Sequence, residues 1–79
     1  MSKKEKLIQH LASLPATMRF SDVQKVLEWH GYELDRSNGS HFIFAKTGQP
    51  SITIPKKGGK TVARTYLRNI VQALELWGT

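Results

Sequence analysis

The chain has 79 residues, and twelve Lys or Arg against six Asp or Glu give it a formal net charge of +6. It contains no cysteine, which excludes disulfides and thiolate nucleophiles and favours a reducing, cytoplasmic setting. Its three histidines lack metal-ligand spacing and its apolar runs are short, so we expect no metal, no cofactor and no membrane span. The length predicts a single domain over residues 1–79, and the basic balance predicts nucleic acid or an acidic protein as partner.

The first predicted helix covers residues 3–14. Its apolar side chains recur at the spacing of one helix face, and Pro15 ends it. These side chains are Leu7, Ile8, Leu11 and Leu14.

The start of a second helix is predicted within residues 20–24, after a short connector. Ser21 is expected to be its N-cap, and Gln24 stands where it completes a capping box. Gly31 is suited to end the helix. The stripe expected to face the core consists of Val23, Val26, Leu27 and His30, with Phe20 packed beneath it.

After Gly31 the hydrophobic period changes to two, which predicts strands over residues 32–36, 41–45 and 51–54. Turns are expected at Asn38-Gly39 and at residues 48–50, and a basic loop over residues 56–60 leads to a last helix over residues 61–77. The expected buried face of that helix is Val62, Tyr66, Ile70, Ala73, Leu74 and Trp77. The order predicts an α+β fold, a three-stranded antiparallel sheet with helices packed on one face.

The hydrophobic pattern of the hairpin favours a three-residue loop over residues 38–40. This loop places Leu34 opposite Phe44 and sends Phe42 and Phe44 to the same face as Tyr32. His41 then points to the other face of the sheet and is exposed to solvent.

His41 follows a tight turn in a strongly basic protein, where an imidazole is a candidate general acid or base for RNA cleavage. The alternative is an exposed hairpin histidine with no task. Ser40 could orient the imidazole or contact phosphate, or it could serve only as a turn residue.

Five basic residues, Lys56, Lys57, Lys60, Arg64 and Arg68, cluster around two glycines and the start of the last helix. Lysines beside a helix N-terminus suit phosphate binding, whereas the alternative is a solvated loop and a charged helix face. The cluster is not a P-loop, because Ile54 occupies the place of the required first glycine.

Several motifs in order give the chain a resemblance to the HicA-type mRNA interferase toxins over about residues 20–72. They are Gly31-Tyr32-Glu33-Leu34, Gly39-Ser40-His41-Phe42-Ile43-Phe44, Ile52-Thr53-Ile54-Pro55, Gly59-Lys60 and Tyr66-Leu67-Arg68-Asn69-Ile70. The resemblance implies a fold similar to double-stranded-RNA-binding domains (αβββα), a metal-independent endoribonuclease acting on mRNA, and a HicB-type antitoxin that covers the catalytic histidine. It assigns the catalytic role to His41 and the motif glycine and serine to Gly39 and Ser40.

Two features depart from the family pattern. Residues 1–19 are predicted to be an additional N-terminal helical extension, and Phe42 stands where a second histidine often follows the motif of the family that the chain resembles. We therefore predict a toxin endoribonuclease in which His41 is catalytic and Gly39, Ser40 and the five basic residues contact RNA. The rival hypotheses are a non-catalytic RNA-binding module of the same fold and a protein-interaction domain with a basic face.

Overall fold

The computed structural model describes residues 2–56 and 60–76, and every element named below lies within these ranges. In chain order the elements are α1 (Lys3–Ala12), β1 (Thr17–Arg19), α2 (Phe20–Trp29), β2 (Glu33–Asn38), β3 (His41–Lys46), β4 (Gln49–Pro55), β5 (Thr61–Ala63) and α3 (Arg64–Leu74).

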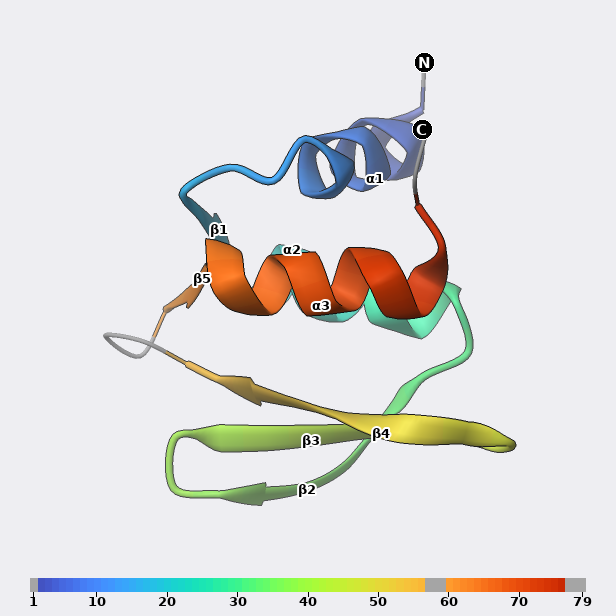
Figure 1. Ribbon diagram of the computed structural model, residues 1–79, viewed down its shortest axis with the longest axis vertical. Helices are drawn as coiled ribbons and strands as arrows, with labels where there is room; N and C mark the ends of the chain where they lie inside the picture. The colour runs from blue at the N-terminus through green and yellow to red at the C-terminus, as the bar shows by residue number, and fades with distance from the viewer. Residues whose placement is uncertain (1, 57–59, 77–79) are drawn as a thin grey trace.

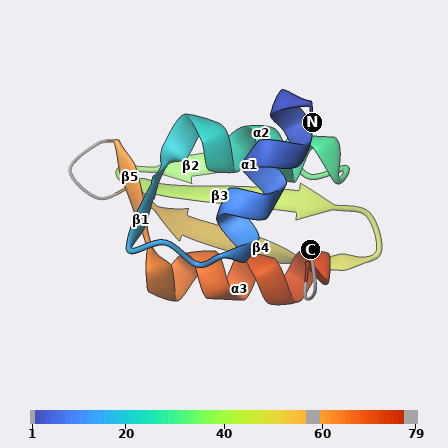
Figure 2. The same ribbon diagram turned by 90° about the horizontal axis from the view of Figure 1, so that it is seen from above.

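The main sheet is antiparallel with strand order β2-β3-β4, and α2 and α3 lie side by side on one of its faces (Figure 1). Seen from above, α1 crosses over α2 and α3 on the side away from the sheet (Figure 2). The predicted α+β fold with helices on one face is confirmed. The sheet face that α2 and α3 leave uncovered is called the open face below.

A single cluster of apolar side chains joins the three helices to the covered face of the sheet. Leu11 of α1 is fully buried in this cluster, so α1 contributes a side chain to the hydrophobic core. The other fully buried members are Val23, Val26, Leu27, Phe44, Ile54, Val62, Leu67, Ile70 and Val71.

For α2, the predicted N-cap is wrong and the predicted C-terminal glycine is confirmed. Ser21 is not the N-cap: Arg19 holds that position and Phe20 is already helical, with its N–H bonded to the carbonyl of Lys60 at 2.8 Å. The neighbouring strand thus fixes the start of the helix, and the expected capping box does not form. At the other end Gly31 has φ +89°, and the N–H of Tyr32 reaches the carbonyl of Leu27, as a glycine-terminated helix requires.

Two short strands were not predicted from the sequence. β1 and β5 pair antiparallel, with Met18 opposite Val62, so residues 61–63 are extended and α3 begins only at Arg64. The buried face of α3 is accordingly rotated from the expected one. Leu67, Ile70, Val71 and Leu74 face the core, while Tyr66 and Ala73 are exposed and Trp77 lies outside the described residues.

The β2–β3 hairpin has the expected strand pairing, but its loop differs from the predicted one. Its loop has two residues, Gly39 and Ser40, because Asn38 pairs with His41, so the predicted three-residue loop is wrong. A bulge at Asp35 restores the register, and Leu34 lies opposite Phe44 as predicted. The β3–β4 turn is likewise shifted, to Thr47 and Gly48.

Candidate functional site

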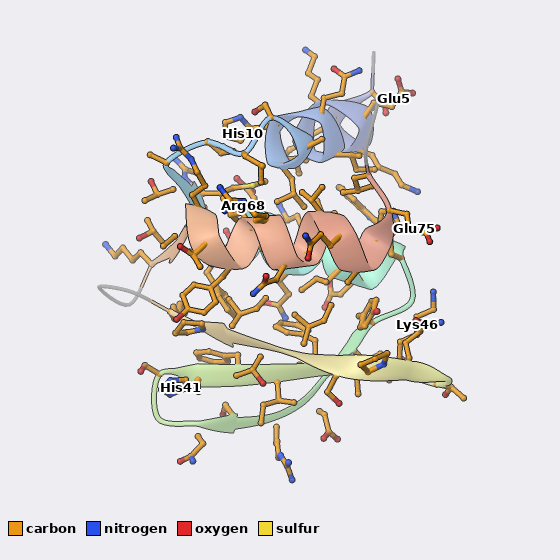
Figure 3. All side chains as sticks on the ribbon, in the orientation of Figure 1. Glu5, His10, His41, Lys46, Arg68 and Glu75 are labelled. Carbon is orange, nitrogen blue, oxygen red and sulfur yellow. The ribbon has the colours of Figure 1, made fainter. Side chains whose placement is uncertain are left out.

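His41 is the first residue of the central strand, and its side chain is exposed. Its neighbours across the two strand pairs are Asn38 and Pro55. Since side chains alternate along a strand and Phe42 and Phe44 pack toward the helices, His41 lies on the open face. An imidazole in that place is accessible to a large substrate, as the alternation predicted (Figure 3).

The turn before His41 depends on a glycine. Gly39 has φ +63°, a left-handed conformation that costs other residues energy, and a Cβ built there would meet nothing within 4 Å. The carbonyl of Ser40 accepts a hydrogen bond from the backbone N–H of Lys56 at 2.8 Å. Gly39, Ser40, His41 and Lys56 therefore lie together at one end of the sheet.

The side chain of Lys56 turns to the covered face, away from His41. Its ammonium lies 4.8 Å from the centroid of the Phe20 ring and 5.3 Å from that of Phe42. A cation above aromatic faces is held by the ring quadrupole, which restricts where this charge can go. The structure thus places the ammonium of Lys56 and the imidazole of His41 on opposite faces of the same strand ends.

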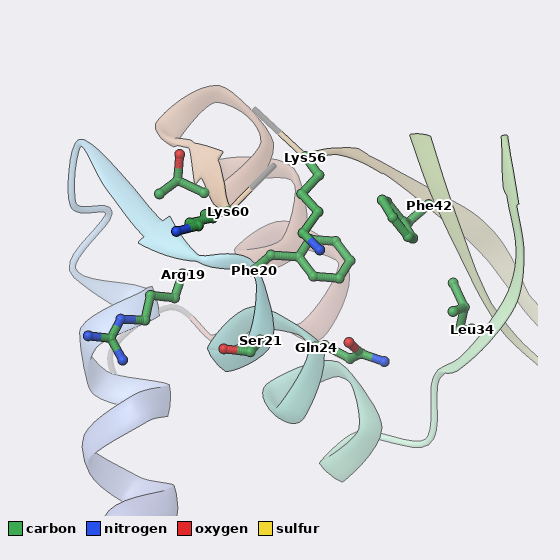
Figure 4. A pocket seen from close by; sticks show the side chains of 9 residues that line it. Arg19, Phe20, Ser21, Gln24, Leu34, Phe42, Lys56 and Lys60 are labelled. Carbon is green, nitrogen blue, oxygen red and sulfur yellow. The ribbon is translucent and has the colours of Figure 1, made fainter. Parts of the chain in front are cut away.

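A groove lies beside this ammonium, between α2 and the covered face of β2 and β3 (Figure 4). Leu34 and Phe42 form the sheet wall, and Phe20 and Gln24 belong to the helix wall. Its volume is about 560 Å³. Among the described residues, those that line it include Arg19, Lys56 and Lys60 and no carboxylate.

Arg64 and Arg68 lie elsewhere. Arg64 donates its Nε–H to the carbonyls of Leu14 and Pro15, at 2.9 Å and 3.3 Å, and so holds the connector between α1 and β1. Arg68 is exposed one turn further along α3, and its side chain points toward α1 (Figure 3). The structure does not bring these two guanidinium groups to His41. The predicted contact Lys57 lies outside the described residues.

The other histidines have simpler surroundings. His30 donates from Nδ1 to the carbonyl of Val26 at 2.8 Å, at the C-terminal end of α2, and His10 is exposed on α1. In the described ranges no three His, Cys, Asp or Glu side chains gather as metal ligands would. No helix of the described chain has the length and apolar character needed to cross a membrane.

Sequence reasoning missed Arg19 and the groove, and it assigned Leu34 only a core position. Leu34 is 44% exposed, and Arg19 is the last residue of β1, a strand only three residues long. The one signal in the sequence was the Leu34–Phe44 pairing, which placed Leu34 on the covered face. That a groove remains between Leu34 and the first turns of α2 depends on how the helix lies over the sheet, which no sequence pattern shows.

Comparison with known proteins gives one match. The family model described as "HicA toxin of bacterial toxin-antitoxin" matches residues 20–76, which is well over half of the chain and includes α2, the sheet and α3. No curated protein matches the chain, and no solved structure does. Residues 2–19, with α1 and β1, precede the matched region.

Proposed function

The chain belongs to the HicA toxin family of bacterial toxin–antitoxin systems, and from that premise we propose that it is an endoribonuclease that cleaves mRNA with His41 and without a metal ion. The observation that carries the proposal is the exposed imidazole on the open face, at the end of the sheet where the chain also presents Gly39, Ser40 and Lys56. The substrate class follows from the net charge of +6 and from the 2′-hydroxyl that RNA places beside each phosphate.

In the proposed reaction the imidazole of His41 accepts the proton of a ribose 2′-hydroxyl. The 2′-oxygen attacks the adjacent phosphorus, an O2′–P bond forms and the P–O5′ bond breaks. The proton passes from the imidazole to the leaving O5′, so the products are a 2′,3′-cyclic phosphate and a free 5′-hydroxyl. A single general acid–base group of this kind contributes about 10²- to 10⁴-fold to a rate.

The RNA contacts proposed for this reaction fall into two groups. Gly39, Ser40, Lys56 and Lys60 belong to the end of the molecule that carries His41, where the two ammonium groups would hold phosphates that flank the cleaved bond. Lys57 is proposed with them from the sequence. Arg64 and Arg68 would contact more distant phosphates along α3, and Arg64 keeps only its terminal NH₂ groups for this purpose.

A toxin of this family has an antitoxin partner. We propose a HicB-type protein that covers His41, and a cytoplasmic location where mRNA and this partner are available. We also propose that residues 1–79 act as one domain in which residues 1–19 are a helical extension. The burial of Leu11 among the core side chains supports that unity.

Inducible expression of the wild-type chain and of His41→Ala in a bacterial host tests the proposal. The wild-type chain should stop growth and shorten cellular mRNA, whereas His41→Ala should accumulate to the same level and do neither. The rival RNA-binding module predicts that both chains bind RNA and that neither degrades it. Equal loss of intact mRNA with both chains would remove His41 from the chemistry.

A further inference from the structure

The groove between α2 and the β2–β3 hairpin combines the two lysines already proposed as phosphate contacts with an apolar wall that the cleavage step does not use. Its sheet wall is apolar, with Leu34 44% exposed and Phe42 partly buried. Three cations, Arg19, Lys56 and Lys60, line it together with one amide and two hydroxyls. None of these groups reaches His41, which lies on the other face of β3.

We propose that this groove binds one nucleotide of the RNA strand, a neighbour of the cleaved bond, with its base against Leu34 and Phe42 and its phosphate at Lys56 and Lys60. The inference rests on RNA being the substrate. Sites for single-stranded nucleic acid combine a flat apolar or aromatic surface for a base with cations for the backbone. The groove brings these two features together within about 560 Å³, inside the range of about 300–1,000 Å³ typical of small-molecule sites.

The position of Lys56 favours a phosphate over a neutral ligand. Its ammonium is held over the Phe20 and Phe42 rings, and within residues 2–56 and 60–76 no carboxylate lines the groove to neutralise it. The tilted rings of Phe20 and Phe42 lie with centroids 4.7 Å apart, and Gln24 and Leu34 lie beside them (Figure 4). The amide of Gln24 points toward Leu34 and can donate to and accept from a base edge there (Figure 4).

The hairpin end provides a short path from the groove to His41. Phe42 follows His41 directly, and the Ser40–Lys56 hydrogen bond closes the sheet at that point. A strand of RNA that passes around this end would place one base on the covered face and the next ribose at the open face. The groove would then fix the position of the bond relative to the imidazole.

The test measures binding of the full chain to a 12-nucleotide RNA whose riboses are all 2′-O-methylated and so cannot be cleaved, and to an abasic strand of equal length and charge. The variants are Leu34→Gln, which makes polar the exposed wall proposed to contact the base, and Lys56→Met, which removes the ammonium. The matched control is Lys46→Met, because the Lys46 ammonium also lies over a ring, 5.7 Å from the centroid of Tyr32, but outside the groove.

The wild-type chain should bind the base-containing strand about 5-fold or more tighter than the abasic strand, the lower limit expected for one stacked base. Leu34→Gln should remove this preference, Lys56→Met should weaken binding of both strands, and Lys46→Met should match the wild type. If both groove variants bind the two strands as tightly as the wild-type chain does, the inference is overturned. This includes the case in which the only interaction that the variants lose is the one with the antitoxin.

Cleavage of unmodified RNA by the same proteins separates the two proposals. If the groove variants weaken binding as expected and the wild-type chain cleaves nothing, the nucleotide site stands and the ribonuclease proposal fails. If the wild-type chain cleaves RNA and both groove variants keep its kcat/KM, the ribonuclease proposal stands and the nucleotide site fails.

Discussion

Replacement of Leu11 with Ala tests whether the segment before the family match is part of the folded core. Leu11 is fully buried in the same cluster as the side chains of α2 and α3, and Leu7 and Ile8 pack beside it. Its truncation removes apolar contacts and leaves a cavity between α1 and the two helices beneath it. The expected loss in the free energy of unfolding is about 3 kcal/mol, within the range of about 2–5 kcal/mol for buried leucines.

That loss is large for a chain of this size. Proteins are stable by about 0.05–0.15 kcal/mol per residue, so 79 residues correspond to roughly 4–12 kcal/mol. Small domains lose about 4–8 °C in Tm for each kcal/mol, so Leu11→Ala should melt roughly 12–24 °C below the wild type. Urea denaturation, monitored by tryptophan fluorescence and by circular dichroism, measures the change in the free energy of unfolding.

The matched control is Gln9→Ala, an exposed position on the same helix, where a surface substitution should change stability by less than about 0.5 kcal/mol. A loss below about 1 kcal/mol for Leu11→Ala would refute the placement of α1 in the core. Two separate unfolding transitions in the wild-type chain would refute it as well.

Three further outcomes are expected. Arg64→Met should speed amide exchange in β1, because the variant loses the hydrogen bonds from Nε to the Leu14 and Pro15 carbonyls; unchanged exchange would mean that those bonds do not hold the connector. Gly39→Ala should lower stability by about 1 kcal/mol through backbone strain alone, since a methyl group there has open space, and a calorimetric scan measures it. Lys60→Met should make the slope of log K against log salt shallower by about 0.7 for single-stranded RNA; an unaltered slope would show that Lys60 touches no phosphate.

The parts of the fold that the sequence predicted are those with a long, regular pattern. The stripe of Val23, Val26 and Leu27 identified α2, and alternation identified β3 and placed His41 opposite the core side chains. Gly31 predicted the end of α2, because a left-handed residue there is a local requirement.

The parts it did not predict depend on contacts between distant segments. β1 and β5 have three residues each and exist because they pair with one another across the fold. The same pairing moved the start of α2 back to Phe20 and that of α3 forward to Arg64, so the cap predicted at Ser21 failed. A bulge at Asp35, which no periodicity reveals, replaced the predicted three-residue loop.

Contacts between distant segments also decide which basic residues of the candidate site share a surface. Along the sequence, Lys56, Lys60 and Arg64 form one continuous cluster. In space, Lys56 packs over aromatic rings on the covered face, and Arg64 bonds the carbonyls before β1. Spacing alone predicted a charge cluster, and only the tertiary structure shows which charges share a surface.

The most direct test of the central claim is the cleavage rate of purified His41→Gln on RNA, with His10→Gln as the control histidine. His10 is exposed on α1, so its variant should cleave at the wild-type rate. His41→Gln should fold with an unchanged Tm, since the side chain is exposed, and should cleave at least about 100-fold more slowly. Cleavage by His41→Gln at the wild-type rate would contradict the account.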